Sequence, residues 1–414
     1  MKRIHLLIIT LILVLAFTSC KNQKNTTKLP AYYLDVLRVK ADLTSSSMRS
    51  IYNPADFDEL EQDILAGKVS STDCYYRLRK IINKYHVAHV YFVPNEIGPK
   101  ILPFGFYCYG NEYHIVQTIK KYEKYLGWKV IEIGGLDPVE AVDRIAAFYS
   151  YETVIAKKYI IERPMAFDDY KYAGLLDKKG NLQLKFESPE GKTEELRLKA
   201  VNVGKYKISR LTPEKENDFL PNFETEKYSI KPCPQKKTLY IPYLSCMARE
   251  DYPAEDWFSN IVKELKSGLY DTLVFDLRYN GGGWQLTQGL PEKYKVELNK
   301  YNVVLVATGR TFSAATIFME SILQVCPDAK IFGEETGQAI YNYTGLKFDP
   351  LKSMNCQFAY PSFLDEISPL TAAKERSDNH YRGIMPDVEV AEDFEVFMQG
   401  EDTIYNAIYE YFNQ

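Results

Sequence analysis

The chain has 414 residues, a formal net charge of −4 at pH 7 and 46% hydrophobic residues. Its basic residues are dispersed rather than gathered in one patch or stripe. This pattern excludes the electrostatic footprint of a nucleic-acid-binding protein.

The N-terminus predicts the signal of a lipoprotein. Lys2 and Arg3 precede an apolar stretch over residues 4–17, which is too short to span a bilayer comfortably. The stretch ends in FTSC, which resembles the lipobox of bacterial lipoproteins, where the cysteine is acylated and becomes the first mature residue. An ordinary secretory signal with a chance cysteine is the alternative. We expect a signal over residues 1–20, a lipid on Cys20, a polar tether over 21–31 and anchorage in the bacterial cell envelope.

The other cysteines suggest neither a metal site nor a redox motif. They are widely scattered, with no CxxC pair and no metal-ligand spacing: Cys74, Cys108, Cys233, Cys246, Cys326 and Cys356. An oxidising envelope would allow one or two disulfides, but most of these residues are interpreted as buried small hydrophobes. No cofactor is expected.

Hydrophobic periodicity divides the roughly 390 residues after the signal into two or three domains. Residues 32–85 show helical spacing, and residues 86–211 alternate short β-like runs with turns. A polar segment rich in Lys and Pro over 212–237 is the expected linker, and residues 238–414 form the expected core domain.

Part of the β-rich region resembles the PDZ-like element of processing proteases. Residues 126–139 contain a strand-like run, the turn Gly134-Gly135, and Pro138 near the start of a helix over 140–148. A plain β-hairpin followed by a helix is the alternative interpretation.

The core domain predicts an α/β fold. Strand-like runs at 239–244, 272–277, 303–307 and 329–332 alternate with helical patterns. Repeated strand–helix units of this length indicate a largely parallel sheet covered by helices. We expect the β-rich run over 346–363 to complete this core and a final amphipathic helix over 403–412 to pack on it.

Two segments of the core carry the chemistry. LVFDLRYNGGG (residues 273–283) ends in three glycines, which let the backbone turn with positive φ and approach a ligand closely. GRTFSAA (309–315) places Ser313 between a strand and a helix, where N–H groups and the helix dipole favour developing negative charge. Together they predict a nucleophile and an oxyanion hole.

A serine hydroxyl needs a positioned base, and histidine is the usual one. Excluding the signal, the chain offers four: His86, His89, His114 and His380.

Four ordered segments resemble the tail-specific (C-terminal processing) protease family of serine peptidases, in its tricorn and retinoid-binding-protein-like branch. They are LVFDLRYNGGG, GRTFSAATIFMESI, AKIFGEETG and YRGIMPDVEV. The resemblance covers residues 239–390 and implies a core related to the crotonase and Clp-protease folds, built from ββα units. By position, Ser313 matches the nucleophile and the N–H of Ala314 one oxyanion donor, with a second donor from Gly282 or Gly283.

The chain departs from the family at the base and at the orienting acid. Processing proteases proper use a lysine near a GEPTFGK-like segment, but this chain reads GEETGQ over 333–338. The other branch uses an N-terminal histidine after a helix, which matches His89, with His86 as the alternative. Near the segment where that branch has a glutamate, the chain has Asp378 and His380, so the orienting acid stays open.

Each candidate also has a structural interpretation. Ser313 could be a helix N-cap, the three glycines a structural turn, and His89 a half-buried strand histidine. Glu334 and Glu335 are further candidates for the orienting acid. Asp276 and Arg278 are expected to hold the strand end rather than to react.

The sequence therefore predicts a lipid-anchored serine endopeptidase that cleaves peptides or unfolded protein tails. The alternative is an inactive, peptidase-like lipoprotein that binds peptide or glycan. Binding of acyl-thioesters by a crotonase-like sheet is a third hypothesis, but no segment marks a nucleotide or phosphate pocket.

Overall fold

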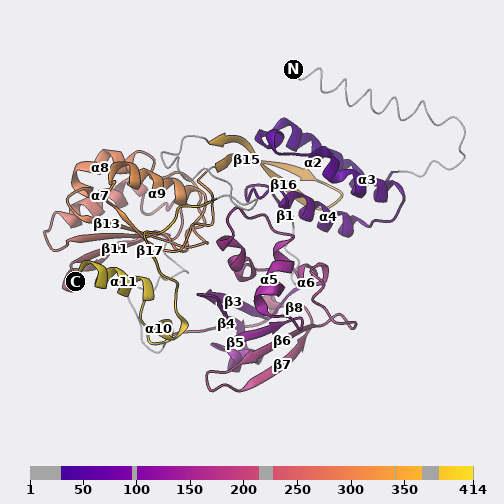
Figure 1. Cartoon of the computed structure of the whole chain (residues 1–414), viewed down its shortest axis with the longest axis horizontal. Helices are drawn as coiled ribbons and strands as arrows, with labels where there is room; N and C mark the ends of the chain where they lie inside the picture. Colours follow the sequence, from indigo (N-terminus) through magenta and orange to yellow (C-terminus); the bar gives the residue numbers. More distant parts are fainter. Residues whose placement is uncertain (1–28, 96–99, 214–226, 341, 366–381, 414) are drawn as a thin grey trace, which may run out of the picture.

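The computed structural model describes residues 29–95, 100–213, 227–340, 342–365 and 382–413. The expected signal, Cys20 and most of the tether lie outside these residues, as do 214–226 of the linker, Asp378 and His380. Figure 1 shows an N-terminal helical part, a middle β-rich part and a C-terminal part with a central sheet.

The N-terminal part is helical, as predicted. Its elements are α2 (Ala31–Ser45), η1 (Ser47–Ser50), η2 (Pro54–Phe57), α3 (Asp58–Leu65) and α4 (Ser71–Asn83). Helix α4 begins with a capping box in which Ser70 and Asp73 satisfy each other's backbone N–H groups. The chain then leaves α4 and enters a turn that contains His89.

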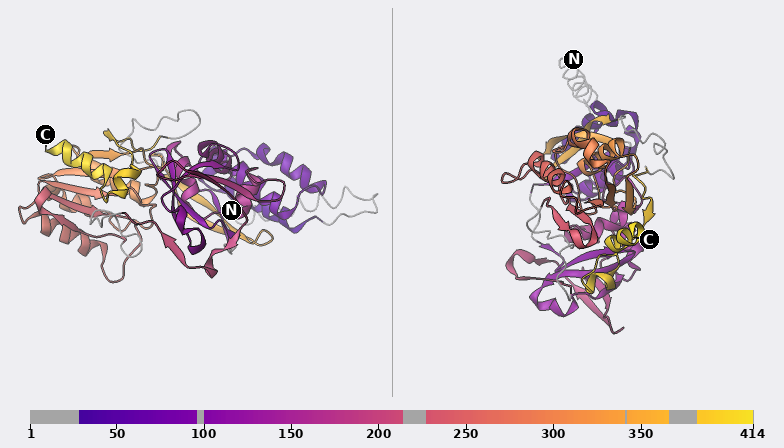
Figure 2. Two further views of the ribbon diagram at one scale, coloured as in Figure 1. Left: turned by 90° about the horizontal axis from the view of Figure 1, so that it is seen from below. Right: turned by 90° about the vertical axis from the view of Figure 1, so that its left-hand side faces the viewer.

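The run over 346–363 does not complete the core sheet, contrary to our expectation. It forms β15 (Asn342–Leu351) and β16 (Cys356–Asp365), which build a separate antiparallel sheet with β1 (Tyr91–Pro94) in the order β1-β16-β15. Leu351 and Phe358 are fully buried in a cluster with the N-terminal helices, and this burial draws the hairpin away from the core. Figure 2 shows these strands beside the indigo helices.

The middle part is an antiparallel sheet in the order β3-β4-β5-β6-β7, with β9 paired to β4. Its strands are β3 (Phe104–Tyr109), β4 (Glu112–Ile119), β5 (Lys129–Ile133), β6 (Leu182–Glu187), β7 (Thr193–Leu198) and β9 (Ile208–Arg210), and β2 (Lys100–Ile101) pairs with β8 (Val201–Asn202). The shorter helices of this part are η3 (Lys120–Tyr125), α5 (Pro138–Ala146), η4 (Ile155–Glu162), α6 (Phe167–Tyr172) and η5 (Val203–Lys205). The predicted strand, Gly-Gly turn and helix are present as β5 and α5.

The C-terminal part is an α/β core with a mostly parallel sheet, as predicted. The strand order is β10-β11-β12-β13-β14-β17, and only β10 is antiparallel to its neighbour. The strands are β10 (Lys231–Cys233), β11 (Thr238–Pro242), β12 (Thr272–Asp276), β13 (Asn302–Ala307), β14 (Lys330–Gly333) and β17 (Val388–Glu389). The helices are η6 (Pro234–Lys236), α7 (Ala254–Leu265), α8 (Leu290–Leu298), α9 (Ala314–Val325), α10 (Phe394–Met398) and α11 (Thr403–Phe412).

Alternation along the strands explains why both faces of this sheet are covered. Successive side chains of a strand point to opposite faces. Leu273 and Phe275 join the cluster under α7 and α9, whereas Val274 between them joins the cluster under α11. Helix α11 therefore packs back on the body, as its amphipathic pattern predicted.

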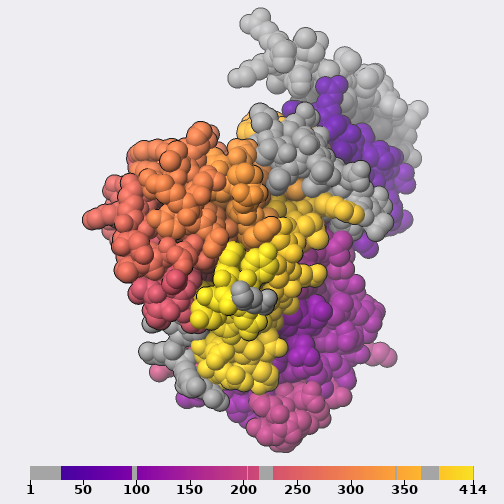
Figure 3. All heavy atoms as spheres, turned by 60° about the vertical axis from the view of Figure 1, so that its left-hand side comes forward, coloured from indigo at the N-terminus to yellow at the C-terminus, as the bar shows by residue number. Residues whose placement is uncertain are grey.

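The chain that follows β17 joins the core to the middle part. Phe394 of α10 stacks on the His114 ring of β4 with ring centroids 3.7 Å apart. Figure 3 shows this C-terminal segment in yellow, lying between the orange core and the purple middle part.

All six described cysteines are free and buried, which confirms their interpretation as small hydrophobes. Among the residues that the structure describes, no helix is both long and apolar enough to cross a membrane.

Candidate active site

Ser313 lies on a strained turn between β13 and α9. Its φ of 58° and ψ of −126° place a residue with a Cβ atom in a conformation that favours glycine. Its side chain makes no capping hydrogen bond to α9, so the N-cap interpretation does not describe it. The hydroxyl is therefore directed elsewhere.

Neighbouring groups hold this strained backbone in place. The N–H of Phe312 donates to Asn280 O at 2.9 Å, and the N–H of Ser313 donates to Gln338 Oε1. The hydroxyl of Thr316 donates to Ser313 O at 2.7 Å. Strain of this kind persists only where the surroundings over-determine it, and it is concentrated at functional sites.

His89 contacts the serine. Its Nε2 atom lies 3.4 Å from Ser313 Oγ, and its ring lies against Phe312 with centroids 4.8 Å apart. The side chain occupies a turn and is 3% exposed, so it is not the half-buried strand histidine that was the alternative. Burial lowers the pKa of His89 to about 4, so the imidazole is neutral at pH 7 and can accept a proton.

The other described histidines lie elsewhere. His86 packs on the ring of Tyr151, with centroids 5.5 Å apart. His114 Nδ1 bonds Gly127 O at 3.0 Å within the middle sheet. The structure thus brings His89, rather than His86, to Ser313.

The triple-glycine turn passes directly beside Ser313. A methyl group on Gly282 would lie 2.5 Å from Ser313 Cβ, so only glycine allows this approach. The N–H of Gly282 donates to Asn280 Oδ1 at 2.9 Å and is therefore engaged. The N–H groups of Gly283 and Ala314 donate to no described residue, which leaves these two as the candidate oxyanion donors.

Asn280 organises this turn, although the sequence analysis did not single it out. It is fully buried, and its Nδ2 donates to Tyr243 O at 2.8 Å while Oδ1 accepts from Gly282. A buried asparagine that satisfies several backbone groups fixes the local conformation. In the sequence, only its position directly before the three glycines could have indicated this role.

Glu152 is a second residue that sequence reasoning missed. Its side chain is 1% exposed, and its two oxygens accept from Ala88 N at 3.1 Å and from Ala339 N at 2.9 Å. These residues adjoin His89 and Gln338, so one carboxyl group ties together both segments that contact Ser313. Burial raises the pKa of Glu152 to about 8.

No described residue hydrogen-bonds His89 Nδ1. Glu334 binds Lys158 and Tyr159, and Glu335 accepts from Gly383 N at 2.7 Å, so neither orients the imidazole. The buried charges at the strand end are structural, because Asp276 pairs with Arg278 at 2.7 Å.

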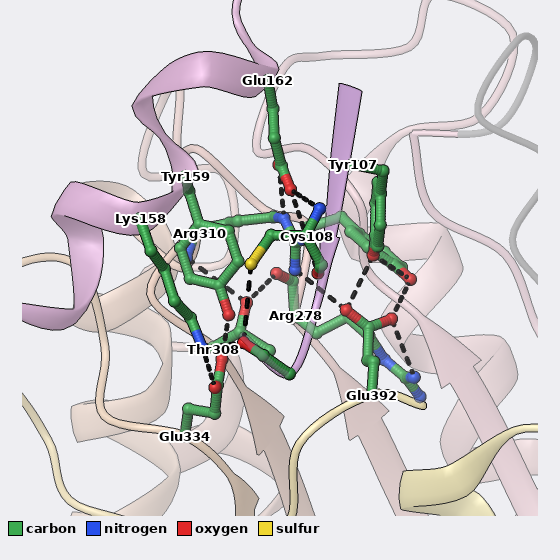
Figure 4. Close-up of polar contacts among 12 residues, drawn as sticks. Tyr107, Cys108, Lys158, Tyr159, Glu162, Arg278, Thr308, Arg310, Glu334 and Glu392 are labelled. Carbon is green, nitrogen blue, oxygen red and sulfur yellow. Dashed lines mark hydrogen bonds and ion pairs between the residues drawn. The ribbon is translucent and has the colours of Figure 1, made fainter. Parts of the chain in front are cut away.

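An ionic network joins the site to the rest of the molecule (Figure 4). Arg310, three residues before Ser313, donates two hydrogen bonds of 2.7 Å to Glu162 of η4 and one of 2.9 Å to Glu392. Arg310 also lies over the Tyr159 ring, 4.0 Å from its centroid. Side chains from the middle part, the core and the C-terminal segment therefore share one cluster.

Ser313 and His89 line a cleft of about 780 Å³. Residues of all three parts contribute to it, including Phe92, Tyr149, Arg163 and Leu346. Among the described residues, no cluster of three or more His, Cys, Asp or Glu side chains is arranged to hold a metal ion. The cleft thus combines a hydroxyl, a neutral imidazole and the glycine turn that carries the unengaged N–H of Gly283.

A scan against protein-family models and a search of curated proteins gave no match. Solved structures do match. A structure of mature CPAF complexed with lactacystin has a TM-score of 0.60 at 12% identity, covering 92% of this chain and 97% of that chain. The chain has the fold of CPAF.

Two further structures extend this comparison. A second structure of mature CPAF gives a TM-score of 0.59 at 13% identity, over 92% of this chain and 95% of that chain. The photosystem II D1 C-terminal processing protease gives a TM-score of 0.38 at 13% identity, over 90% and 95%. The two CPAF structures show the fold of this chain, a mixed α/β architecture with a parallel sheet.

Proposed function

We propose that the chain is a lipid-anchored serine-type endopeptidase that cleaves peptides or unfolded protein tails in the bacterial cell envelope. The observation that carries the proposal is the pairing of His89 Nε2 with Ser313 Oγ at 3.4 Å. Catalytic hydrogen bonds are often long in unliganded enzymes and tighten when substrate binds.

The proposed reaction follows from this geometry. Ser313 Oγ attacks the scissile carbonyl carbon while its proton passes to His89 Nε2, and the oxyanion accepts hydrogen bonds from Ala314 and Gly283. His89 then gives the proton to the leaving amine, and water hydrolyses the acyl-enzyme by the same steps. An oxyanion donor typically contributes about 3–4 kcal/mol to lowering the barrier.

The experiment is labelling of the full-length protein with a fluorophosphonate probe, followed by turnover of a mixed peptide library. We expect labelling of the wild type, none of Ser313→Ala and strongly slowed labelling of His89→Ala. Equal labelling of Ser313→Ala would refute the nucleophile. Because mature CPAF is complexed with lactacystin, that compound is a suitable competitor.

The alternative is a peptidase-like lipoprotein that binds peptide or glycan without cleavage. The observation that favours it is His89 Nδ1, which is buried and has no partner among the described residues. Peptide retained by the purified protein without any cleavage product would select this alternative.

The same proposal includes three further points. They are the PDZ-like character of the middle part, the relation of the core to crotonases and Clp proteases, and the lipid on Cys20. Mass spectrometry of the N-terminal peptide tests the lipid, because acylation adds a fixed mass to a peptide that begins at Cys20.

A further inference from the structure

Arg163 presents a charge to the cleft that contains the proposed nucleophile. It follows directly after η4 and lines the same cleft as Ser313 and His89. Its side chain is exposed, so a bound molecule can reach the guanidinium.

Arg163 differs from the other two arginines of this cleft. Arg79 pairs with Asp169 at 2.5 Å, and Arg310 pairs with Glu162. The guanidinium of Arg163 makes no hydrogen bond and no ion pair with any described residue, and only its backbone N–H is engaged, donating to Ile160 O at 3.2 Å. The only carboxylate in the described lining, that of Glu162, is already engaged by Arg310.

The protein fixes the backbone at Arg163 relative to the loop that carries Ser313. Glu162, the residue before Arg163, is held by two hydrogen bonds of 2.7 Å from Arg310, as Figure 4 shows. Arg310 in turn precedes Ser313 by three residues in the same loop. The backbone that carries Arg163 is thus tied to the backbone that carries the nucleophile.

The surroundings of Arg163 favour an anionic ligand. Desolvation by the surrounding protein lowers the pKa of Arg163, but a guanidinium remains protonated at neutral pH. The planar fork of arginine matches a carboxylate with two parallel hydrogen bonds.

We propose that Arg163 binds a carboxylate of the peptide in the cleft, from an acidic side chain or from the C-terminus. This inference rests on one part of the proposed function, namely that the cleft binds peptides. It therefore applies to the peptidase and to the inactive binder alike.

The test measures binding rather than cleavage, so that failure of the catalytic proposal does not affect it. The full-length Ser313→Ala variant is titrated into fluorescent, unstructured alanine-based peptides that carry one Glu at successive positions. Each peptide has a matched Gln version, and each is made with a free and with an amidated C-terminus. The same titrations use Arg163→Gln and Arg163→Lys in the Ser313→Ala background.

Arg144→Gln is the control, because Arg144 is an exposed arginine of α5 that pairs with Glu140. We expect tighter binding of the Glu or free-acid peptides by about tenfold to a hundredfold. Arg163→Gln should abolish this preference, Arg163→Lys should retain part of it, and Arg144→Gln should leave it unchanged.

The peptide pair that shows the preference identifies the source of the carboxylate. A preference for Glu over Gln points to an acidic side chain, and a preference for the free acid over the amide points to the C-terminus. No preference in either series, or one that survives Arg163→Gln in protein with an unchanged melting temperature, would overturn the proposal.

Discussion

The side-chain oxygen of Gln338 accepts the backbone N–H of Ser313. Gln338 is fully buried and lies in the loop after β14, where the sequence resembles a segment that carries a catalytic lysine in C-terminal processing proteases. Here the side chain holds the backbone of the proposed nucleophile instead of activating its hydroxyl. In the proposed reaction, His89 rather than a lysine in this loop takes the proton of Ser313.

Gln338→Met keeps the volume of the side chain but removes the acceptor. We expect the free energy of unfolding to fall by about 1–3 kcal/mol, because the Ser313 N–H loses its partner. Fluorophosphonate labelling should slow by about tenfold, which corresponds to about 1.4 kcal/mol of barrier. The control is Gln288→Met at an exposed glutamine, and equal labelling rates in both variants would contradict the positioning role.

Ser313→Gly should be more stable than Ser313→Ala. Both variants lose the hydroxyl and should lose labelling, but only glycine adopts a φ of 58° and ψ of −126° without strain. We expect a difference of about 1–3 kcal/mol in urea unfolding. Equal stability of the two variants would show that the turn is unstrained in solution.

The pKa of His89 predicts the acid pH at which labelling by the probe falls. Its pKa is lowered to about 4 by burial, so labelling should fall below about pH 4, where the imidazolium cannot accept a proton. Labelling rates measured from acid to neutral pH test this directly. A midpoint near the ordinary histidine pKa of about 6.5 would contradict it.

The same shift predicts how His89 affects stability. The folded-state pKa is below the unfolded value, so the unfolded chain binds the proton more tightly. The stabilising contribution is therefore complete above about pH 6.5 and is lost as the pH falls towards 4. His89→Phe should remove this part of the pH dependence in unfolding experiments.

The raised pKa of Glu152 predicts that its contribution to stability changes with pH in the opposite direction. Burial raises its pKa to about 8, so the folded state favours the protonated carboxyl group. Its contribution is present at acid pH and is lost as the pH rises through 8. Glu152→Gln should flatten the loss of stability between about pH 5 and pH 9, and an unchanged slope would contradict this assignment.

Arg310→Met should strongly destabilise the protein. The variant leaves Glu162 largely buried without its cation and leaves Glu392 with Arg278 alone, at 3.7 Å, and breaking a buried pair in this way typically costs about 3–5 kcal/mol. Arg144→Met is the matched control, because its pair with Glu140 is exposed and contributes at most about 1 kcal/mol. Similar unfolding midpoints for the two variants would show that the network is not stabilising.

The elements that depend on local pattern were predictable from the sequence. The periodicity of the N-terminal helices, the strand–helix alternation of the core and the amphipathic α11 all gave the observed structure. The pairing of Ser313 with His89 was also anticipated, because the motifs around both residues resemble one family.

The features that depend on distant contacts were not predictable. The hairpin of β15 and β16 was assigned to the core because nothing in its own residues specifies β1 as its partner. Glu152 lies 64 residues from Ala88 and 187 from Ala339, so no spacing rule could link it to the site. The role of Gln338 likewise depends on a backbone group 25 residues away.

The proposed base and nucleophile are separated by 224 residues in the chain and meet only where three parts of the molecule come together. A nascent or half-assembled chain therefore has an ordinary, unactivated hydroxyl at position 313. In the proposed reaction, hydrolysis therefore requires that the segment with His89 has folded against the core, and a chain that is still being made cannot carry it out.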